Sequence, residues 1–233
     1  MTVNGVWTEA RGQAAKGTVL LCSGGPGCCD YMRPVSEMLE DAYRVIRFEQ
    51  RGCGRSVADG RYDLQTTLQD MEAIREAYGL DEWIICGHSW GADLALMYAL
   101  EFPARTSAVI FMAGRALSRN IEWAAAYHAN KEARGEAHPK WDYPFNFDVN
   151  KQGNVDYNAY VQQPALYASL AKLDCPVLLL SGKQDVRPYW PVEQVHHLLP
   201  NSRFCLLEEA AHYLWLDAPQ AVRQILREFL DIT

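Results

Sequence analysis

The chain has 233 residues, of which 49% are hydrophobic and 11% aromatic, and its formal net charge is −7. This composition excludes an intrinsically disordered chain, and the length suits one α/β domain with an insertion. No basic stripe favours nucleic acid or an anionic membrane as a partner, and no apolar run approaches the roughly 20 residues that span a bilayer. The N-terminus shows no signal peptide, so we expect a cytoplasmic protein.

Short apolar runs alternate with amphipathic segments along most of the chain. The expected strands are 18–23, 43–49, 83–86, 107–112, 176–181 and 203–207. The expected helices are 31–41, 63–78, 89–102, 192–199 and 218–230. Strands that are apolar throughout and separated by helices predict an α/β fold, with a mostly parallel, doubly wound sheet and helices on both faces. Ligands bind such sheets beyond the carboxyl ends of the strands.

One segment of about 60 residues, 115–174, breaks this alternation and carries many aromatic residues. A loop of that length needs a purpose or its own structure. We expect one or two helices in 117–135 and irregular chain with a further short helix in the rest. The predicted organisation is an α/β core of residues 1–114 and 175–233, with a small cap or lid at 115–174 over the site. The alternative is that this segment is a solvent-exposed loop without a lid function.

The pentapeptide Gly87-His88-Ser89-Trp90-Gly91 fits the pattern G-x-S-x-G. It follows a predicted strand and opens a predicted helix, which is the context in which this motif exposes a nucleophilic serine on a sharp turn. Glycines on either side let the strand and the helix pack closely around that turn. We therefore expect Ser89 to be the nucleophile and the Trp90 N–H to be an oxyanion donor.

A serine hydroxyl needs a base, and the base needs an orienting carboxylate. His212 follows the last predicted strand, and Asp185 follows the strand before it. The order Ser89, Asp185, His212 is the one that α/β-hydrolases use. The alternatives are that His212 caps the last helix and that Asp185 is a turn residue. Asp93 lies on the helix after the nucleophile and is rejected as the triad acid.

A glycine-rich loop, Ser23-Gly24-Gly25-Pro26-Gly27, follows the first predicted strand. Glycines allow backbone N–H groups to converge on an anion. We expect the Gly25 N–H to be the second oxyanion donor and Gly24 to contact the substrate; a glycine turn without function is the alternative. The loop lacks the Gly-Lys-Ser/Thr of a phosphate loop.

Three motifs together resemble the proline iminopeptidase branch of the α/β-hydrolase superfamily. They are the glycine-rich loop, the segment 49–56 (EQRGCGRS) and the serine turn 88–96 (HSWGADLAL). The resemblance spans about residues 17–113 and 175–230. It implies an α/β-hydrolase fold, a Ser-Asp-His triad, no cofactor, and release of N-terminal proline from peptides.

The chain departs from that family at several positions. Ser23 stands where the family has His, Glu49 where it has Asp, and His88 where its peptidases often have Gly. The insertion is shorter than the usual helical cap, whose acidic residues hold the free amine of the substrate in those peptidases. Residues of the insertion that are candidates for substrate binding are Glu122, Trp123 and Tyr127, and the alternative for Glu122 is an exposed helix glutamate.

Two further expectations concern charged and sulfur-containing side chains. Arg51 and Glu49 are expected to form a buried ion pair beside the oxyanion loop. The seven cysteines lack metal spacing. Three of the cysteines fall on loops near the predicted site, namely Cys28, Cys29 and Cys53. They are candidates for reactive thiols, and the alternative is that they are inert.

The sequence thus predicts a serine hydrolase that acts by acyl transfer on a small amide or ester, with a small molecule or a short peptide as its substrate. The aromatic insertion favours a compact apolar pocket. Within the same fold, a carboxylesterase and a carbon–carbon bond hydrolase are alternatives. A ligand-binding protein that keeps the triad and turns over slowly is a more distant one.

Overall fold

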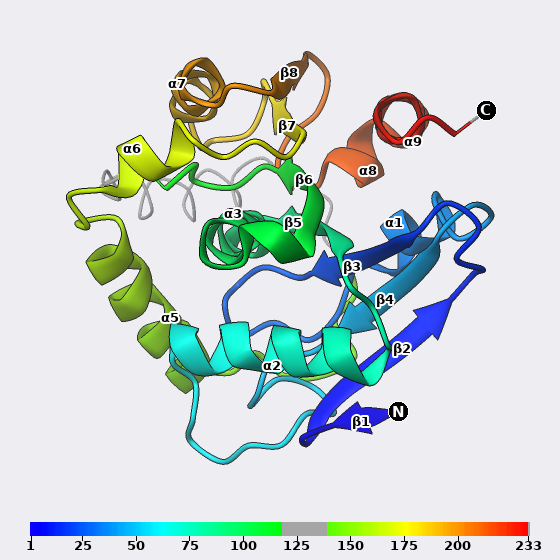
Figure 1. Ribbon diagram of the computed structural model, residues 1–233, viewed down its shortest axis with the longest axis vertical. Coiled ribbons are helices and arrows are strands. Elements are labelled where there is room, and N and C mark those ends of the chain that lie inside the picture. The colour runs from blue at the N-terminus through cyan, green and yellow to red at the C-terminus, as the bar shows by residue number, and fades with distance from the viewer. Residues whose placement is uncertain (118–138, 233) are drawn as a thin grey trace.

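The computed structural model describes residues 1–117 and 139–232, and their strands form one sheet (Figure 1). The strand order is β1-β2-β4-β3-β5-β6-β7-β8. The strands are β1 (Thr2–Val3), β2 (Val6–Arg11), β3 (Thr18–Cys22), β4 (Arg44–Phe48), β5 (Trp83–His88), β6 (Thr106–Met112), β7 (Val177–Gly182) and β8 (Ser202–Leu207). Strands β3 to β8 run parallel to one another, and β1 and β2 add an antiparallel edge.

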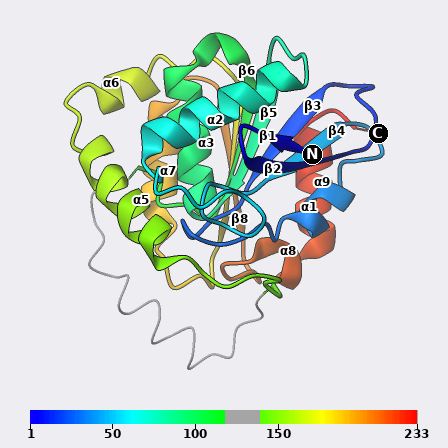
Figure 2. The ribbon, with the colours of Figure 1, turned by 90° about the horizontal axis from the view of Figure 1, so that it is seen from below.

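Helices cover both faces of the sheet, as Figures 1 and 2 show. One face carries α2 (Leu64–Ala77), α3 (Trp90–Glu101), α5 (Phe147–Tyr160), α6 (Leu166–Leu170) and α7 (Trp190–Leu198). The other face carries α1 (Arg33–Glu37), α8 (Leu214–Asp217) and α9 (Pro219–Phe229). A single 3-10 turn, η1 (Pro103–Arg105), joins α3 to β6.

The central strand β5 shows why its sequence is apolar throughout. Trp83 and Ile85 pack into the hydrophobic cluster on the α3 side, while Ile84 and Cys86 pack into the cluster on the α9 side. Successive side chains of a strand point to opposite faces, so a strand covered on both faces needs apolar residues at every position. The predicted doubly wound α/β fold is confirmed.

The N-terminal hairpin was not predicted. It turns at Asn4 and Gly5, which both have positive φ angles of 50° and 84°. Asn-Gly is a strong signal for a two-residue hairpin turn, because both residues tolerate this conformation. Strand β2 then pairs antiparallel with β4 and extends the sheet beyond its parallel part.

The insertion holds more helix than expected, because α5 is a helix of 14 residues and not a short one. Its buried positions are Val149, Gly153 and Tyr157, spaced four residues apart, and most other positions are polar. So narrow an apolar stripe gives a weak periodic signal. The helices expected in 117–135 lie almost wholly outside the described residues, and the division into core and lid stays a prediction.

Candidate active site

Ser89 lies on a sharp turn between β5 and α3. Its φ of 59° and ψ of −125° are strained for a residue with a side chain, and its N–H donates to the Met112 carbonyl at 2.8 Å. A side chain at Gly87 would collide with the backbone of Gly91, and a Cβ at Gly24 would lie 2.6 Å from the Ser89 Cβ. The surrounding glycines therefore allow three segments of backbone to meet at the serine.

Asp185 and His212 form a pair at the ends of the next strands. His212 Nδ1 lies 2.8 Å from Asp185 Oδ2, and the two side chains are almost fully buried. The Arg187 N–H donates to the other carboxylate oxygen at 2.9 Å. Burial by itself raises the pKa of Asp185, but the charge and hydrogen bond of His212, with the nearby Arg187, hold that pKa below its ordinary value. An ionised Asp185 orients the imidazole with its Nε2 unprotonated, as a general base requires.

A buried chain of hydrogen bonds joins the glycine-rich loop to the histidine loop. The Gly24 N–H donates to the Tyr31 phenol at 2.6 Å, and that phenol lies 2.8 Å from His88 Nδ1. Burial raises the pKa of Tyr31 well above its ordinary value, so the phenol stays protonated, and it donates to Nδ1 because the ring proton of His88 is on Nε2, which faces a carbonyl. His88 Nε2–H then donates to the His212 carbonyl at 2.9 Å. One tautomer of His88 thus ties the positions of both loops together.

The predicted oxyanion loop is held from two sides. Gly25 has a φ of 121°, and a Cβ there would lie 2.8 Å from the N atom of Cys28, so only glycine fits. The Gly24 N–H is engaged by Tyr31, so Gly25 stays the predicted oxyanion donor of the two glycines. From α5, Asn150 Nδ2 donates to the carbonyls of Gly25 at 3.0 Å and Pro26 at 2.9 Å. The described part of the insertion therefore positions this loop.

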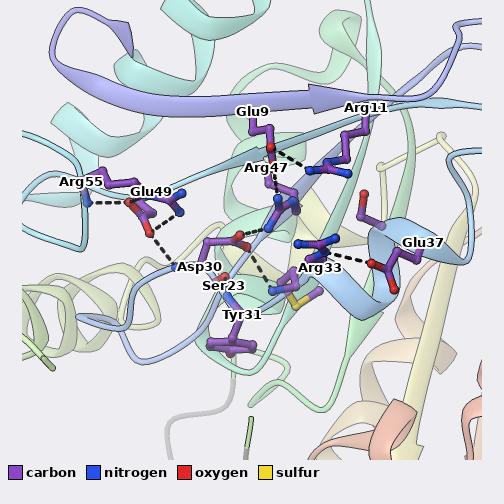
Figure 3. A network of polar contacts seen from close by, with 12 residues as sticks. Glu9, Arg11, Ser23, Asp30, Tyr31, Arg33, Glu37, Arg47, Glu49 and Arg55 are labelled. Carbon is purple, nitrogen blue, oxygen red and sulfur yellow. Dashed lines mark hydrogen bonds and ion pairs between the residues drawn. The ribbon is translucent and has the colours of Figure 1, made fainter. Parts of the chain in front are cut away.

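An ionic network underlies the same loop (Figure 3). Glu49 is buried and accepts from Arg55 Nη2 at 2.8 Å and from the Asp30 N–H at 3.1 Å. Arg47 pairs with the carboxylates of Asp30 and Glu9. These contacts fix the chain that follows the glycine-rich loop, and Figure 3 shows Asp30 between the Glu49–Arg55 pair and Arg47.

The expected ion pair between Arg51 and Glu49 is wrong. Arg51 instead donates from Nε and Nη2 to both oxygens of Asp70, each at 2.7 Å, and it also pairs with Asp59. Glu49 pairs with Arg55, six positions further along the chain. A planar guanidinium matches the two oxygens of one carboxylate best, and α2 presents Asp70 in that geometry.

Arg187 is a residue of the site that sequence reasoning missed. Its Nη1 donates to Ser89 Oγ at 3.0 Å and to the Ala113 carbonyl at 3.3 Å. It comes from the loop after β7, two residues beyond Asp185. No motif marks an arginine at this position, and only its nearness to Asp185 in the sequence could have pointed to it.

Asp93, which was rejected as the triad acid, and the histidine His196 both have structural contacts away from the triad. Asp93 is buried and accepts from the N–H groups of Arg115 and Leu117, which holds the chain after β6. His196 lies on α7 and bonds to Ser202. The candidate substrate-binding residues Glu122, Trp123 and Tyr127 lie outside the described residues.

The loop thiols have the properties of inert cysteines. None of the seven cysteines forms a disulfide, and Cys28, Cys29 and Cys53 are buried. Burial raises the pKa of Cys29 and raises that of Cys53 to about 12. A reactive cysteine needs a lowered pKa, so these values favour the inert alternative.

Among residues 1–117 and 139–232, no three His, Cys, Asp or Glu side chains are grouped so that they could hold a metal ion. None of the helices in the same residues is both long and apolar enough to cross a membrane.

Comparison with known proteins shows which family the chain resembles. Residues 17–145 match the family model described as the alpha/beta hydrolase fold. A proline iminopeptidase of Xylella fastidiosa is 38% identical over 111 residues, which cover 45% of this chain but only 35% of that protein. A proline iminopeptidase of Lactobacillus delbrueckii is 26% identical over 91% of this chain and 89% of the relative. An esterase structure from Exiguobacterium antarcticum superposes with a TM-score of 0.75 at 21% identity, over 97% of this chain and 95% of that one, and shares the fold.

Proposed function

We propose that this chain, which belongs to the α/β-hydrolase family, cleaves a small ester or amide by acyl transfer through Ser89. The observation that carries the proposal is the strained backbone of Ser89 at the end of β5, together with a buried, ionised Asp185 that orients His212. Strain at a serine is unfavourable for folding, and it persists where the chain needs the hydroxyl exposed at a helix N-terminus.

In the acylation step, Ser89 Oγ attacks the carbonyl carbon while its proton moves to His212 Nε2. The negative charge that develops on the carbonyl oxygen is stabilised by the N–H groups of Gly25 and Trp90 and by the N-terminus of α3. The bond to the leaving group then breaks, and His212 gives its proton to the departing alcohol or amine.

In the deacylation step, water attacks the acyl-enzyme and His212 accepts its proton. The same two N–H groups stabilise the second tetrahedral intermediate. Its collapse returns the proton to Ser89 and releases the carboxylic acid. Loss of one oxyanion donor typically lowers the rate by about 10²–10³-fold.

Release of N-terminal proline is the second candidate. It is supported by the similarity to proline iminopeptidases over 91% of the chain. It also needs a group that binds the free amine of the substrate, and the candidate for that role, Glu122, lies outside the described residues. Ester hydrolysis needs no such group, so the described geometry supports the broader activity best.

A paired rate assay tests the proposal and separates the candidates. Proline β-naphthylamide is compared with p-nitrophenyl acetate and butyrate, with Ser89→Ala as the control. Faster, Ser89-dependent release from the proline amide supports the aminopeptidase. Ester cleavage alone supports an esterase, and Ser89→Ala turnover above a few per cent of wild type contradicts the assignment of the nucleophile.

A further inference from the structure

Arg187 brings a positive charge to the nucleophile that the acyl-transfer mechanism does not use. Its Nη1 lies 3.0 Å from Ser89 Oγ. Proton transfer, attack and oxyanion stabilisation are already assigned to His212, Ser89 and two backbone N–H groups. A guanidinium keeps its charge and presents planar N–H donors that match a carboxylate.

The position of Arg187 is fixed by the site itself. Its backbone N–H donates to Asp185 Oδ1, the oxygen that His212 does not use. The triad carboxylate therefore anchors the loop that carries the arginine, and the side chain reaches across to the serine. This arrangement couples the place of the guanidinium to that of the reacting groups.

We propose that Arg187 binds a carboxylate carried by the acyl group of the substrate. The inference rests on the proposed function, because it assumes that the carbonyl carbon approaches Ser89 Oγ. An attack distance of about 3 Å and an Arg–carboxylate hydrogen bond of about 3 Å place the carboxylate within roughly 9 Å of that carbon. Half-esters and half-amides of short dicarboxylic acids, such as succinyl or glutaryl compounds, fit this reach.

The bond from Arg187 to the Ala113 carbonyl can be exchanged for one to the substrate. It is 3.3 Å long, and its acceptor is neutral. A carboxylate forms a shorter, charge-assisted bond of about twice the strength. The exchange therefore replaces a weaker bond of the Arg187 side chain with a stronger one.

The same charge acts against a substrate with a free amine next to the scissile carbonyl. If the guanidinium and the protonated amine are about 5 Å apart, their repulsion at an effective dielectric constant near 20 weakens substrate binding by about a hundredfold. The two candidates therefore make opposite predictions for Arg187: its charge favours a substrate with a carboxylate and disfavours one with a free amine.

The experiment compares two esters with acyl chains of equal length, mono(p-nitrophenyl) glutarate and p-nitrophenyl pentanoate. The readout is the ratio of their kcat/KM values in wild type, Arg187→Gln and Arg187→Lys. We expect Arg187→Gln to lower the glutarate-to-pentanoate ratio by about 10–100-fold, mainly through KM of the glutarate, since a hydrogen bond to a charged group is lost. Arg187→Lys should restore part of the ratio. Arg223→Gln, on the exposed side of α9, is the matched control and should leave the ratio unchanged.

An equal loss for both esters would overturn the proposal, because it would show that Arg187 acts on the nucleophile and not on the substrate. A wild-type ratio below that of Arg187→Gln would overturn it as well. Thermal shift of the Ser89→Ala protein with free glutarate separates this proposal from the proposed function. Stabilisation that Arg187→Gln abolishes in the Ser89→Ala background supports the carboxylate site even if esters are not hydrolysed, and no stabilisation contradicts it.

Discussion

Replacing Tyr31 with phenylalanine removes one buried oxygen that joins two catalytic loops. The phenol accepts from the Gly24 N–H and donates to His88 Nδ1, and Tyr31 is 6% exposed. Each buried polar group that loses its partner costs about 1–3 kcal/mol, and two groups lose theirs, so the free energy of unfolding should fall by about 2–6 kcal/mol. Tyr43→Phe is the matched control, because its buried phenol makes one bond, to the Leu230 carbonyl at 3.0 Å, and should cost about 1 kcal/mol.

Urea unfolding of both variants measures this difference in the free energy of unfolding, provided that the slope of that free energy against urea concentration is the same in both. The rate of ester hydrolysis gives the second readout. Tyr31→Phe should lower kcat about tenfold, because partial displacement of the Gly25 N–H costs less than the 10²–10³-fold loss of a whole donor. Tyr43→Phe should keep the wild-type kcat. If the two variants are equally stable, or if Tyr31→Phe keeps full kcat, the chain from Gly24 to His212 does not position the site.

Three further predictions concern other parts of the site. Asp185→Asn should lower kcat by about four orders of magnitude with the fold retained. Because folding lowers the pKa of Asp185, the free energy of unfolding that its carboxylate contributes, measured by urea unfolding of wild type against Asp185→Asn, should stay constant from pH 8 to about 5 and be lost only below about pH 4. A loss of this contribution near pH 6 would contradict the prediction. Asn150→Ala should lower kcat about tenfold with little change in KM, since it releases the Gly25 carbonyl. Asn158→Ala, at an exposed position further along α5, should not lower it, and equal kcat values for the two variants would show that the loop needs no support from α5. Cys53, with a pKa of about 12, should resist iodoacetamide at pH 8 in the folded protein, as peptide mass spectrometry can show, and rapid modification would refute an inert thiol.

The sequence predicts those parts of the site that depend on position along the chain. Ser89, Asp185 and His212 each follow an apolar strand, and parallel strands bring their carboxyl ends to one edge of the sheet. Close packing also leaves a local mark, because Gly87 and Gly91 flank the turn at a fixed spacing. These features follow from short-range rules and need no knowledge of side-chain contacts.

Contacts between distant side chains leave no such mark. Arg187 bonds to a serine 98 residues away, and Asn150 bonds to a loop 125 residues away. An arginine or an asparagine at these positions resembles any exposed polar residue in the sequence. The wrong pairing of Arg51 with Glu49 has the same origin, since nearness along the chain says little about which carboxylate a long side chain reaches.

Covalent labelling of the nucleophile tests the central claim most directly. The protein is treated with a fluorophosphonate, which forms a stable adduct with an activated serine, and the modified peptide is identified by mass spectrometry. We expect one adduct per chain, on Ser89, with labelling absent in Ser89→Ala and strongly slowed in His212→Ala. An adduct on another residue, or ester hydrolysis by a protein whose Ser89 is not labelled, would contradict the proposed mechanism.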